Sequence, residues 1–330
     1  MSDLDSYKDS MRRFRLAKYM LEIESGKDGL NLPTYKGSTF RGGFGHAFRS
    51  MVCTMKKTDC TNCLLKEQCP YSYIFETSPG HRSEVLNNFE EVPRPYVIEP
   101  PPEKKTFYKP GEKIRFELIL IGKAIEYLPY FLVTFVELGN MGIGRGRKPY
   151  VLRRVLGQNP FKRVEHLIYS DEDKKVRNCD ITITGEDILN QADNGVHSPA
   201  QITLSFQTPT RIKYDNHFAT KLEFHILIGN LLRRFSNLSY FHNDTKISID
   251  YKTFVETATQ VIIKNDFTVW EDWERYSSRQ QDRMKMGGLV GNITYEGNLA
   301  PYLPLIILGE YIHAGKNITF GLGKYVVKKF

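Results

Sequence analysis

Four of the five cysteines in this chain lie within one short stretch, at Cys53, Cys60, Cys63 and Cys69, and Cys179 stands apart. Thiolates at such short spacing are typical of tetrahedral zinc, since two residues between Cys60 and Cys63 let both sulfurs reach one ion. Four protein sulfurs leave no open coordination position, so we expect structural zinc. An iron–sulfur cluster is the alternative, because sulfur ligation alone does not separate the two, and unliganded thiols are a third interpretation.

Two glycine-rich loops also have residue types suited to chemistry. One contains Gly142, Gly144 and Gly146, and the other runs from Gly315 to Gly323. Glycines have no side chains, so their backbone N–H groups could approach phosphates closely. Neither loop fits the spacing of a P-loop, which excludes that nucleotide site, and the first loop does not have the spacing of a dinucleotide fingerprint. Ordinary turn chemistry is the alternative interpretation.

Positive charge is concentrated near the first loop. The 330 residues carry a formal net charge of +8 and a pI near 9.0. Residues 141–164 hold a basic stripe without an acidic residue, which could bind a polyanion such as a phosphate backbone or be a solvated face. Its members are Arg145, Arg147, Lys148, Arg153, Arg154, Lys162 and Arg163.

The composition limits the class of protein. With 41% hydrophobic and 25% charged residues the chain can bury sizeable cores, which excludes a disordered or fibrous protein. No window approaches the roughly 18 apolar residues of a membrane span, and the first fifteen residues do not form a secretory signal. We therefore expect a cytoplasmic protein with no membrane partner.

The elements that must position these residues follow the same order twice. Each half predicts β, α, β, β, α, a glycine-rich loop and a final β, which is a ferredoxin-like unit shared by the RNA recognition motif. The first half predicts strands at 13–23, 114–121 and from Tyr150, helices at 40–53 (capped by Ser38-Thr39) and 127–138, and a proline-rich edge or loop at 93–102. The second predicts strands at 202–212, 260–267, 290–295 and from Tyr325, helices at 222–238 and 305–313, and a polar excursion at 268–288.

The expected fold is therefore α+β, with tandem ferredoxin-like βαββαβ domains. Residues 1–198 form the N-terminal domain, which carries the four-cysteine insert at about 53–71. Residues 199–330 form the C-terminal domain with the second glycine-rich loop.

Five stretches in this order carry a resemblance: Phe40-Arg-Gly-Gly-Phe-Gly-His46, Cys69-Pro-Tyr, Thr208-Pro-Thr-Arg-Ile-Lys213, Gly287-Gly-Leu-Val-Gly291 and His313-Ala-Gly-Lys-Asn-Ile-Thr-Phe-Gly-Leu-Gly-Lys-Tyr325. Together they resemble the CRISPR-associated repeat-cleaving endoribonucleases, the precursor-crRNA processing branch of the RAMP superfamily. Within that family they resemble a branch that contains cysteines. The resemblance covers nearly the whole chain and is most specific in the last stretch. There His313 stands where the family often has its first glycine.

The resemblance implies metal-independent cleavage of CRISPR repeat RNA. The ribose 2′-OH would attack the adjacent phosphate and leave a 2′,3′-cyclic phosphate and a 5′-OH end, which requires a base, an acid and positive charge. Histidine suits the first two roles because its pKa lies near working pH. We predict His46 or His313 as the proton-transferring group and Lys316 as the cation for the phosphorane.

Helical spacing places His46 opposite Phe40, Phe44, Phe48 and Met51, beside Gly42, Arg49 and Ser50, so the imidazole is expected to face outward. An ordinary surface histidine is the alternative for His46, and an interaction with the helix dipole is the alternative for His313. The RNA-binding residues that we expect are Arg41, Arg49, Arg145, Arg147, Lys148, Arg233, Arg234, Gly315, Gly321, Gly323 and Lys324.

Two other function classes remain open. A non-catalytic crRNA-binding RAMP subunit of an effector complex would carry the same stripe, loops and fold, and histidines at the site favour the enzyme. A zinc-containing DNA-binding regulator is more distant, because no recognition helix follows the cysteines.

Overall fold

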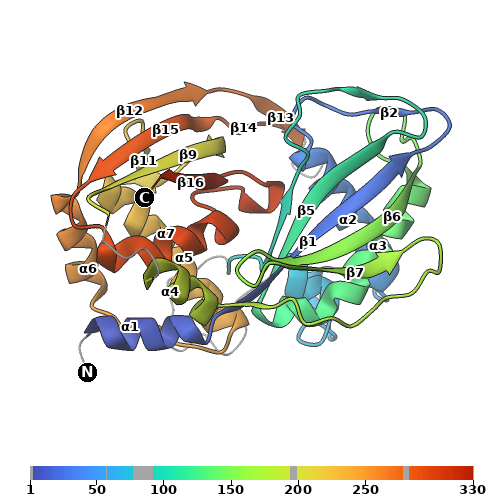
Figure 1. Cartoon of the computed structure of the whole chain (residues 1–330). Helices are drawn as coiled ribbons and strands as arrows, with labels where there is room; N and C mark the ends of the chain where they lie inside the picture. The colour runs from blue at the N-terminus through green and yellow to red at the C-terminus, as the bar shows by residue number, and fades with distance from the viewer. Residues whose placement is uncertain (1–2, 57, 77–91, 194–198, 278–281, 330) are drawn as a thin grey trace. The chain divides into compact units, whose positions relative to one another are not determined.

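The fold is taken from a computed structural model that describes residues 3–56, 58–76, 92–193, 199–277 and 282–329. The chain divides into two compact units. One unit is Leu16–Thr182, and the other joins Met1–Arg15 to Ile183–Phe330. Each unit has its own sheet with helices packed on it (Figure 1).

The unit of Leu16–Thr182 is built on an antiparallel sheet in the order β3-β5-β1-β6-β7. On β1, Tyr19, Leu21 and Ile23 are buried and alternate with residues of the opposite face, as a strand with one covered side requires. The strands are β1 (Arg15–Ser25), β3 (Tyr96–Glu99), β5 (Lys113–Ile121), β6 (Tyr150–Asn159) and β7 (Val164–Ser170).

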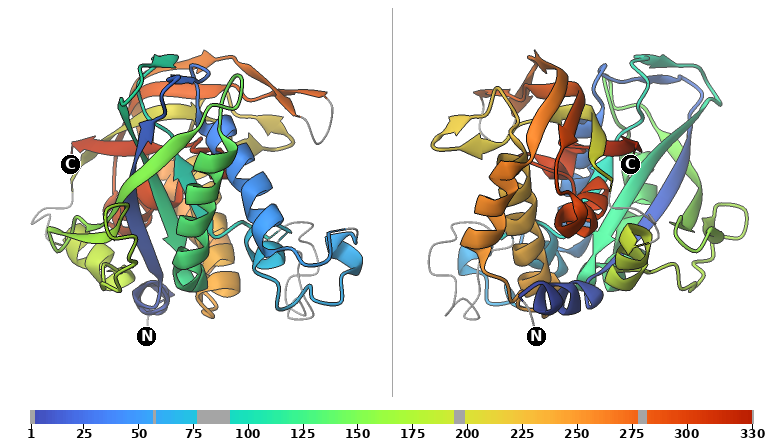
Figure 2. Two further views of the ribbon diagram at one scale, coloured as in Figure 1. Left: turned by 90° about the vertical axis from the view of Figure 1, so that its right-hand side faces the viewer. Right: turned by 60° about the vertical axis from the view of Figure 1, so that its left-hand side comes forward.

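Helices α2 (Gly37–Val52) and α3 (Leu128–Met141) pack side by side on this sheet, as the left view of Figure 2 shows. Aromatic rings join them: the Phe44 ring centroid lies 4.8 Å from that of Phe131 and 4.9 Å from that of Phe135. All three side chains are fully buried. The chain order β1, α2, β3, β5, α3, β6 confirms the expected ferredoxin-like unit.

Two details of the sequence prediction for α2 are wrong. The helix begins at Gly37, before the expected cap Ser38-Thr39, because Lys36 is buried and its Nζ donates to the carbonyl oxygen of Glu103 at 2.6 Å. That tertiary contact fixes the first turn independently of capping propensity. Met51, which the helical spacing placed on the buried face, is 40% exposed because it lies at the last turn, beyond the core.

The second unit repeats the topology with the sheet order β12-β15-β9-β16. The chain order β9, α5, β12, β15, α7, β16 confirms the second ferredoxin-like repeat, and α5 and α7 pack against each other. Its elements are β9 (Gln201–Thr210), α5 (Phe224–His242), β12 (Ile262–Glu271), β15 (Gly288–Glu296), α7 (Leu303–Ile312) and β16 (Tyr325–Lys329).

Shorter elements complete the described chain. The predicted polar excursion holds the hairpin β13–β14, and its residues 278–281 lie outside the described residues. No helix within the described ranges is both long and apolar enough to span a bilayer. The remaining elements are β2 (Leu30–Asn31), β4 (Phe107–Tyr108), β8 (Ile183–Thr184), β10 (Lys213–Tyr214), β11 (His217–Phe218), β13 (Glu274–Ser277), β14 (Asp282–Lys285), α1 (Asp3–Arg12), α4 (Gly185–Asp193), α6 (Tyr251–Thr257) and the helical turns Cys60–Asn62, Ser72–Glu76, Gly122–Tyr127, Ala258–Gln260, Ala300–Tyr302 and Ile318–Phe320.

The division into units differs from the expected boundary at residue 198. Helix α1, at the beginning of the chain, belongs to the second unit because Tyr7 packs its ring 5.5 Å from Phe254 and 6.0 Å from Phe235. Helix α4 packs on α7 and on α1, so it belongs there too. These contacts join residues far apart in sequence, and local patterns do not reveal them.

Substitutions of Tyr7 test the assignment of α1 to the second unit. Its ring is fully buried, and its hydroxyl is buried with no hydrogen-bond partner among the described residues. Tyr7→Ala should destabilise the second unit by about 3–5 kcal/mol, since a large cavity would remain. Tyr7→Phe should be neutral or stabilising, because it removes an unpaired buried hydroxyl. Denaturant unfolding monitored by circular dichroism measures both, and an unchanged midpoint for Tyr7→Ala would contradict the packing of α1.

Candidate functional site

His46 lies on the exposed face of α2. Phe40, Phe44 and Phe48 of the same helix are fully buried, whereas His46 and Arg49 are exposed. The orientation predicted from the helical spacing is thus present. An exposed imidazole can reach a reacting group on a bound molecule and exchange protons with it near neutral pH.

The two arginines expected on this helix have aromatic neighbours. The guanidinium carbon of Arg41 lies 5.2 Å from the ring centroid of Phe75, and that of Arg49 lies 5.7 Å from the ring centroid of Tyr71. Arg41 is only half-exposed, and Arg49 is hydrogen bonded to Cys53. Arg49 therefore joins the His46 face of α2 to the cysteine segment.

Gly42 lies one turn before His46 on the same helix and is also exposed. Beyond its chain neighbours and the backbone of its own helix, a Cβ added at Gly42 would meet no described atom within 4 Å. Within a helix, glycine costs about 0.5–1 kcal/mol relative to alanine. Packing within the described chain gives no reason for this glycine.

The first glycine-rich loop holds cations on a fixed backbone. Arg145 and Arg147 are exposed, and the Arg145 N–H donates to the carbonyl oxygen of Asn31 at 2.9 Å. Arg147 has φ +46°, a left-handed conformation that is unfavourable for a residue with a Cβ. Lys148 is ion-paired with Asp28 at 3.3 Å, so the free positive charge of this loop comes mainly from the two arginines.

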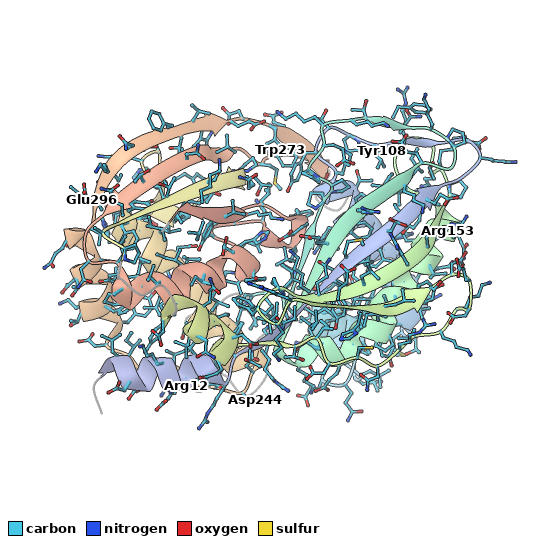
Figure 3. All side chains as sticks on the ribbon, in the orientation of Figure 1. Arg12, Tyr108, Arg153, Asp244, Trp273 and Glu296 are labelled. Carbon is cyan, nitrogen blue, oxygen red and sulfur yellow. The ribbon has the colours of Figure 1, made fainter. Side chains whose placement is uncertain are left out.

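The rest of the basic stripe is partly neutralised. Arg153, labelled in Figure 3, bonds Glu24 at 2.9 Å and Asp171 at 2.9 Å. Arg154 bonds Glu22, whose side chain is only 1% exposed. Lys162 and Arg163 are exposed. The uninterrupted stripe of the sequence is therefore divided in space, because acidic side chains of β1 lie beside the arginines of β6.

Three cationic side chains form ion pairs with Glu22 on β1. The nitrogen atoms of Arg115, Arg154 and Lys113 lie 2.7, 3.1 and 3.4 Å from its carboxylate oxygens. Burial would raise the pKa of Glu22, but the hydrogen bonds from Arg115 and Arg154 overcome this effect and hold the pKa below its usual value. The carboxylate stays charged at neutral pH and fixes these cations on neighbouring strands.

The second glycine-rich loop encloses His313. The side chain is fully buried, and Nδ1 lies 3.0 Å from the carbonyl oxygen of Leu322. His313 caps α7 with φ +59° and ψ +166°, a region that almost only glycine adopts. A buried ring cannot touch an RNA phosphate unless the loop rearranges.

The backbone amides of this loop bond within the protein. The N–H of Gly315 donates to Asn230 Oδ1 at 2.8 Å, that of Gly321 to the oxygen of Ile318 at 2.8 Å, and that of Gly323 to the oxygen of Pro209 at 3.2 Å. The expected role of these three glycines, to offer amides to phosphate, is therefore wrong for this conformation. The sequence could not reveal it, because the accepting groups lie elsewhere in the chain.

The charged residues near this loop differ in exposure. Lys316 and Arg233 are exposed and Lys324 is half-buried. Arg234, which we expected to bind RNA, instead turns inward: its Nε donates to the carbonyl oxygen of Ile312 at 2.6 Å. Burial lowers the pKa of Arg234 to about 9, so it stays protonated at neutral pH. A cation at the C-terminus of α7 stabilises the helix dipole, and Arg234 is not positioned to bind RNA.

Two residues that were not predicted as site residues hold the loop in place. Thr208 Oγ1 donates to the oxygen of Gly321 at 2.9 Å and accepts from the N–H of Lys324 at 2.9 Å. Asn230 binds Gly315 as described. The sequence contained a signal for Thr208, because this residue lies in the Thr-Pro-Thr-Arg stretch. It contained none for Asn230, which is an asparagine within a helix.

The predicted site residues thus belong to different units. His46, Arg41, Arg49, Arg145, Arg147 and Lys148 lie in Leu16–Thr182, whereas His313, Lys316, Arg233, Arg234, Gly315, Gly321, Gly323 and Lys324 lie in the other unit.

The four cysteines are all described, are all free thiols and are partly buried. Burial and the charge of Glu76 raise the pKa of Cys60, Arg49 opposes them, and Cys53 and Cys69 are near enough to contribute. No group of three or more His, Cys, Asp and Glu side chains in the described ranges is arranged to hold a metal ion. The thiols gather in one region without forming a ready tetrahedral set, so zinc stays a prediction.

Two family models match the chain. AF_1859_N, described as an N-terminal domain, covers residues 14–181, and CRISPR_Cas6, described as CRISPR-associated endoribonuclease Cas6, covers residues 204–325. An uncharacterized protein of Archaeoglobus fulgidus is 24% identical over 301 residues, which make up 90% of this chain and 93% of that protein.

Solved structures with the same fold include several Cas6 proteins. A Cas6 product complex is 14% identical with a TM-score of 0.56, and the match covers 94% of this chain and 99% of that chain. Thermus thermophilus Cas6 is 12% identical with a TM-score of 0.51, covering 95% and 98%. A partial Cas6-RT-Cas1–Cas2 complex is 15% identical with a TM-score of 0.57 and covers 96% of this chain. This chain spans only 46% of the chain that it matches in that complex.

Elemental analysis tests the metal prediction. If the thiols bind zinc when it is supplied, the purified protein should contain about one zinc per chain. The double change Cys60→Ser and Cys63→Ser should abolish metal binding and lower the unfolding temperature, because metal binding contributes folding free energy. Cys179→Ser is the matched control and should retain the metal. Neither zinc nor iron near one equivalent would contradict the prediction.

Glycine substitutions separate packing from conformational strain in the two loops. A Cβ on Gly323 (φ +75°) would lie 1.8 Å from the oxygen of Ala314, whereas on Gly146 (φ +80°) it would meet only Lys148 Cε at 3.7 Å. Gly146→Ala should cost about 1–2 kcal/mol from strain alone, and Gly323→Ala about 2–5 kcal/mol because overpacking is added. Chemical denaturation measures both losses. Equal losses would show that the contact with Ala314 relaxes freely.

Proposed function

This chain belongs to the Cas6/RAMP-type family of CRISPR-associated proteins, and we propose that it cuts CRISPR repeat RNA, with His46 as its proton-transferring residue. Membership of this family indicates that the function is either RNA cleavage or RNA binding. The observation that carries the choice of residue is exposure: His46 is exposed on α2, whereas His313 is buried. Only an exposed imidazole can touch the reacting atoms of a bound RNA.

The proposed reaction is attack of a ribose 2′-OH on the adjacent phosphorus. The 2′-oxygen loses its proton and bonds to phosphorus, the bond from phosphorus to the 5′-oxygen breaks, and that oxygen receives a proton. The products are a 2′,3′-cyclic phosphate and a 5′-OH end. His46 exchanges one of these two protons, which contributes about 10²–10⁴-fold to the rate. The chemistry requires proton transfer and positive charge, so we propose that it proceeds without a metal ion.

Positive charge at the phosphate is the second requirement. Lys316 is an exposed ammonium group on the second glycine-rich loop, and Arg145 and Arg147 are exposed on the first. We assign the two arginines, which belong to the same unit as His46, to phosphates along the strand. Lys316 belongs to the other unit, and its role as the cation for the phosphorane stays a prediction. In this proposal His313 positions the loop through Leu322 and transfers no proton.

The proposed partner is CRISPR repeat RNA within a precursor transcript. The Cas6 product complex and the Cas6-RT-Cas1–Cas2 complex support RNA processing and assembly with other CRISPR subunits as the setting. The exposed arginines also agree with a polyanionic partner.

The experiment is cleavage of the cognate repeat RNA in EDTA under single-turnover conditions. His46→Ala should lower the rate at least about a hundredfold with RNA affinity within a few fold of wild type. A 2′-deoxy substitution at the scissile nucleotide should abolish cleavage, because the nucleophile is missing. His166→Ala is the matched control, since His166 is another exposed histidine of the same unit.

Different results would select other functions. Wild-type rates from His46→Ala would show that another group transfers the proton. Tight repeat binding without cleavage by the wild type would identify a non-catalytic crRNA-binding subunit. Cleavage that requires an added divalent metal would contradict the proposed mechanism.

A further inference from the structure

One glycine of α2 stands out when the helix glycines are compared. Gly43 has a reason to be glycine, since an added Cβ would lie 2.9 Å from Leu138 Cδ1 of α3. Gly45 has another, because its Cβ would lie 3.0 Å from a ring carbon of Phe75. At Gly42 an added Cβ would meet no described atom within 4 Å beyond its chain neighbours and the backbone of its own helix. Gly42 weakens the helix without improving its packing.

The position of Gly42 relates it to His46. Residues four apart on a helix are neighbours on one face, with Cβ positions about 5–6 Å apart. Both residues are exposed, in the interior of a helix whose opposite face is buried by Phe40 and Phe44. The surface immediately before His46 is therefore bare backbone, without a side chain between the helix and a molecule bound there.

We infer that the sugar–phosphate backbone of the RNA crosses α2 over Gly42, in contact with the helix backbone, and that this close approach sets the scissile nucleotide against His46. The inference rests on the proposed function and adds a positioning residue to it. Because glycine has no Cβ, it lets another chain approach the helix backbone more closely than any other residue does. Because His46 is one turn away on a rigid helix, a nucleotide seated on Gly42 lies at a fixed distance from the imidazole.

The inference predicts opposite changes in stability and activity. Gly42→Ala should raise the unfolding temperature of its unit by about 1–4 °C, since alanine favours the helix and has room. The same change should lower the single-turnover cleavage rate at least about tenfold, because the methyl group displaces the RNA from His46. Gly42→Val should lower the rate further and weaken repeat binding. A purely structural glycine cannot give higher stability with lower activity.

Gly229→Ala on α5 is the matched control. Gly229 is also a helix glycine with room, since a Cβ there would only touch Val255 at 3.6 Å. This change should raise stability in the same way and leave cleavage within twofold of wild type. Melting temperature, repeat affinity and cleavage rate are measured on the same preparations.

The outcomes decide between this inference and its premise. Cleavage by Gly42→Ala within twofold of wild type, together with a lost rate in His46→Ala, would overturn the inference and keep the proposed function. A lower melting temperature for Gly42→Ala would also overturn it, because the glycine would then serve folding. If the wild type binds the repeat without cutting it, repeat affinity becomes the readout: a loss of at least about tenfold in Gly42→Val supports the RNA path, and unchanged affinity overturns it.

Discussion

The burial of one aromatic face of α2 is the constraint on which the rest of the candidate site depends. Phe44 packs between Phe131 and Phe135 of α3, and Phe40 packs 4.6 Å from the ring centroid of Phe116 on β5. Burying several aromatic side chains on one stripe leaves no freedom to rotate the helix. The opposite stripe, with Gly42 and His46, must then be exposed, and the chemistry proposed for the imidazole follows from packing on the other side of the helix.

The second glycine-rich loop obeys a different constraint, the need to satisfy its backbone. Its amides bond to Asn230, Arg211 and Pro209, and close contacts at Gly315 and Gly323 leave no room for a Cβ. His313 adopts an unfavourable backbone conformation within this network, and the hydrogen bond of its ring to Leu322 helps to hold it there. The loop is therefore a rigid support that presents Lys316.

Electrostatics divides the basic residues into two groups. Glu22 and Glu24 on β1 neutralise part of the charge of the neighbouring strands, and these ion pairs hold Arg153 and Arg154 against the sheet. Arg145 and Arg147 on the first loop lie outside that network. Neither arginine is ion-paired with a described residue, so on a loop anchored through Asn31 they can bind phosphates without first breaking such a pair.

The sequence by itself determined the two βαββαβ repeats and the outward direction of His46, because both depend on local periodicity: alternation in strands and a repeat of about 3.6 residues in helices. It could not determine that His313 is buried, that Arg234 turns inward, that the loop amides are satisfied internally, or that α1 belongs with the C-terminal repeat. Each of these depends on a partner distant in sequence, such as Leu322 for His313, Ile312 for Arg234 and Phe254 for Tyr7. Local patterns fix which side of an element is apolar, and only tertiary packing decides which polar group finds a partner and which one is left to meet a substrate.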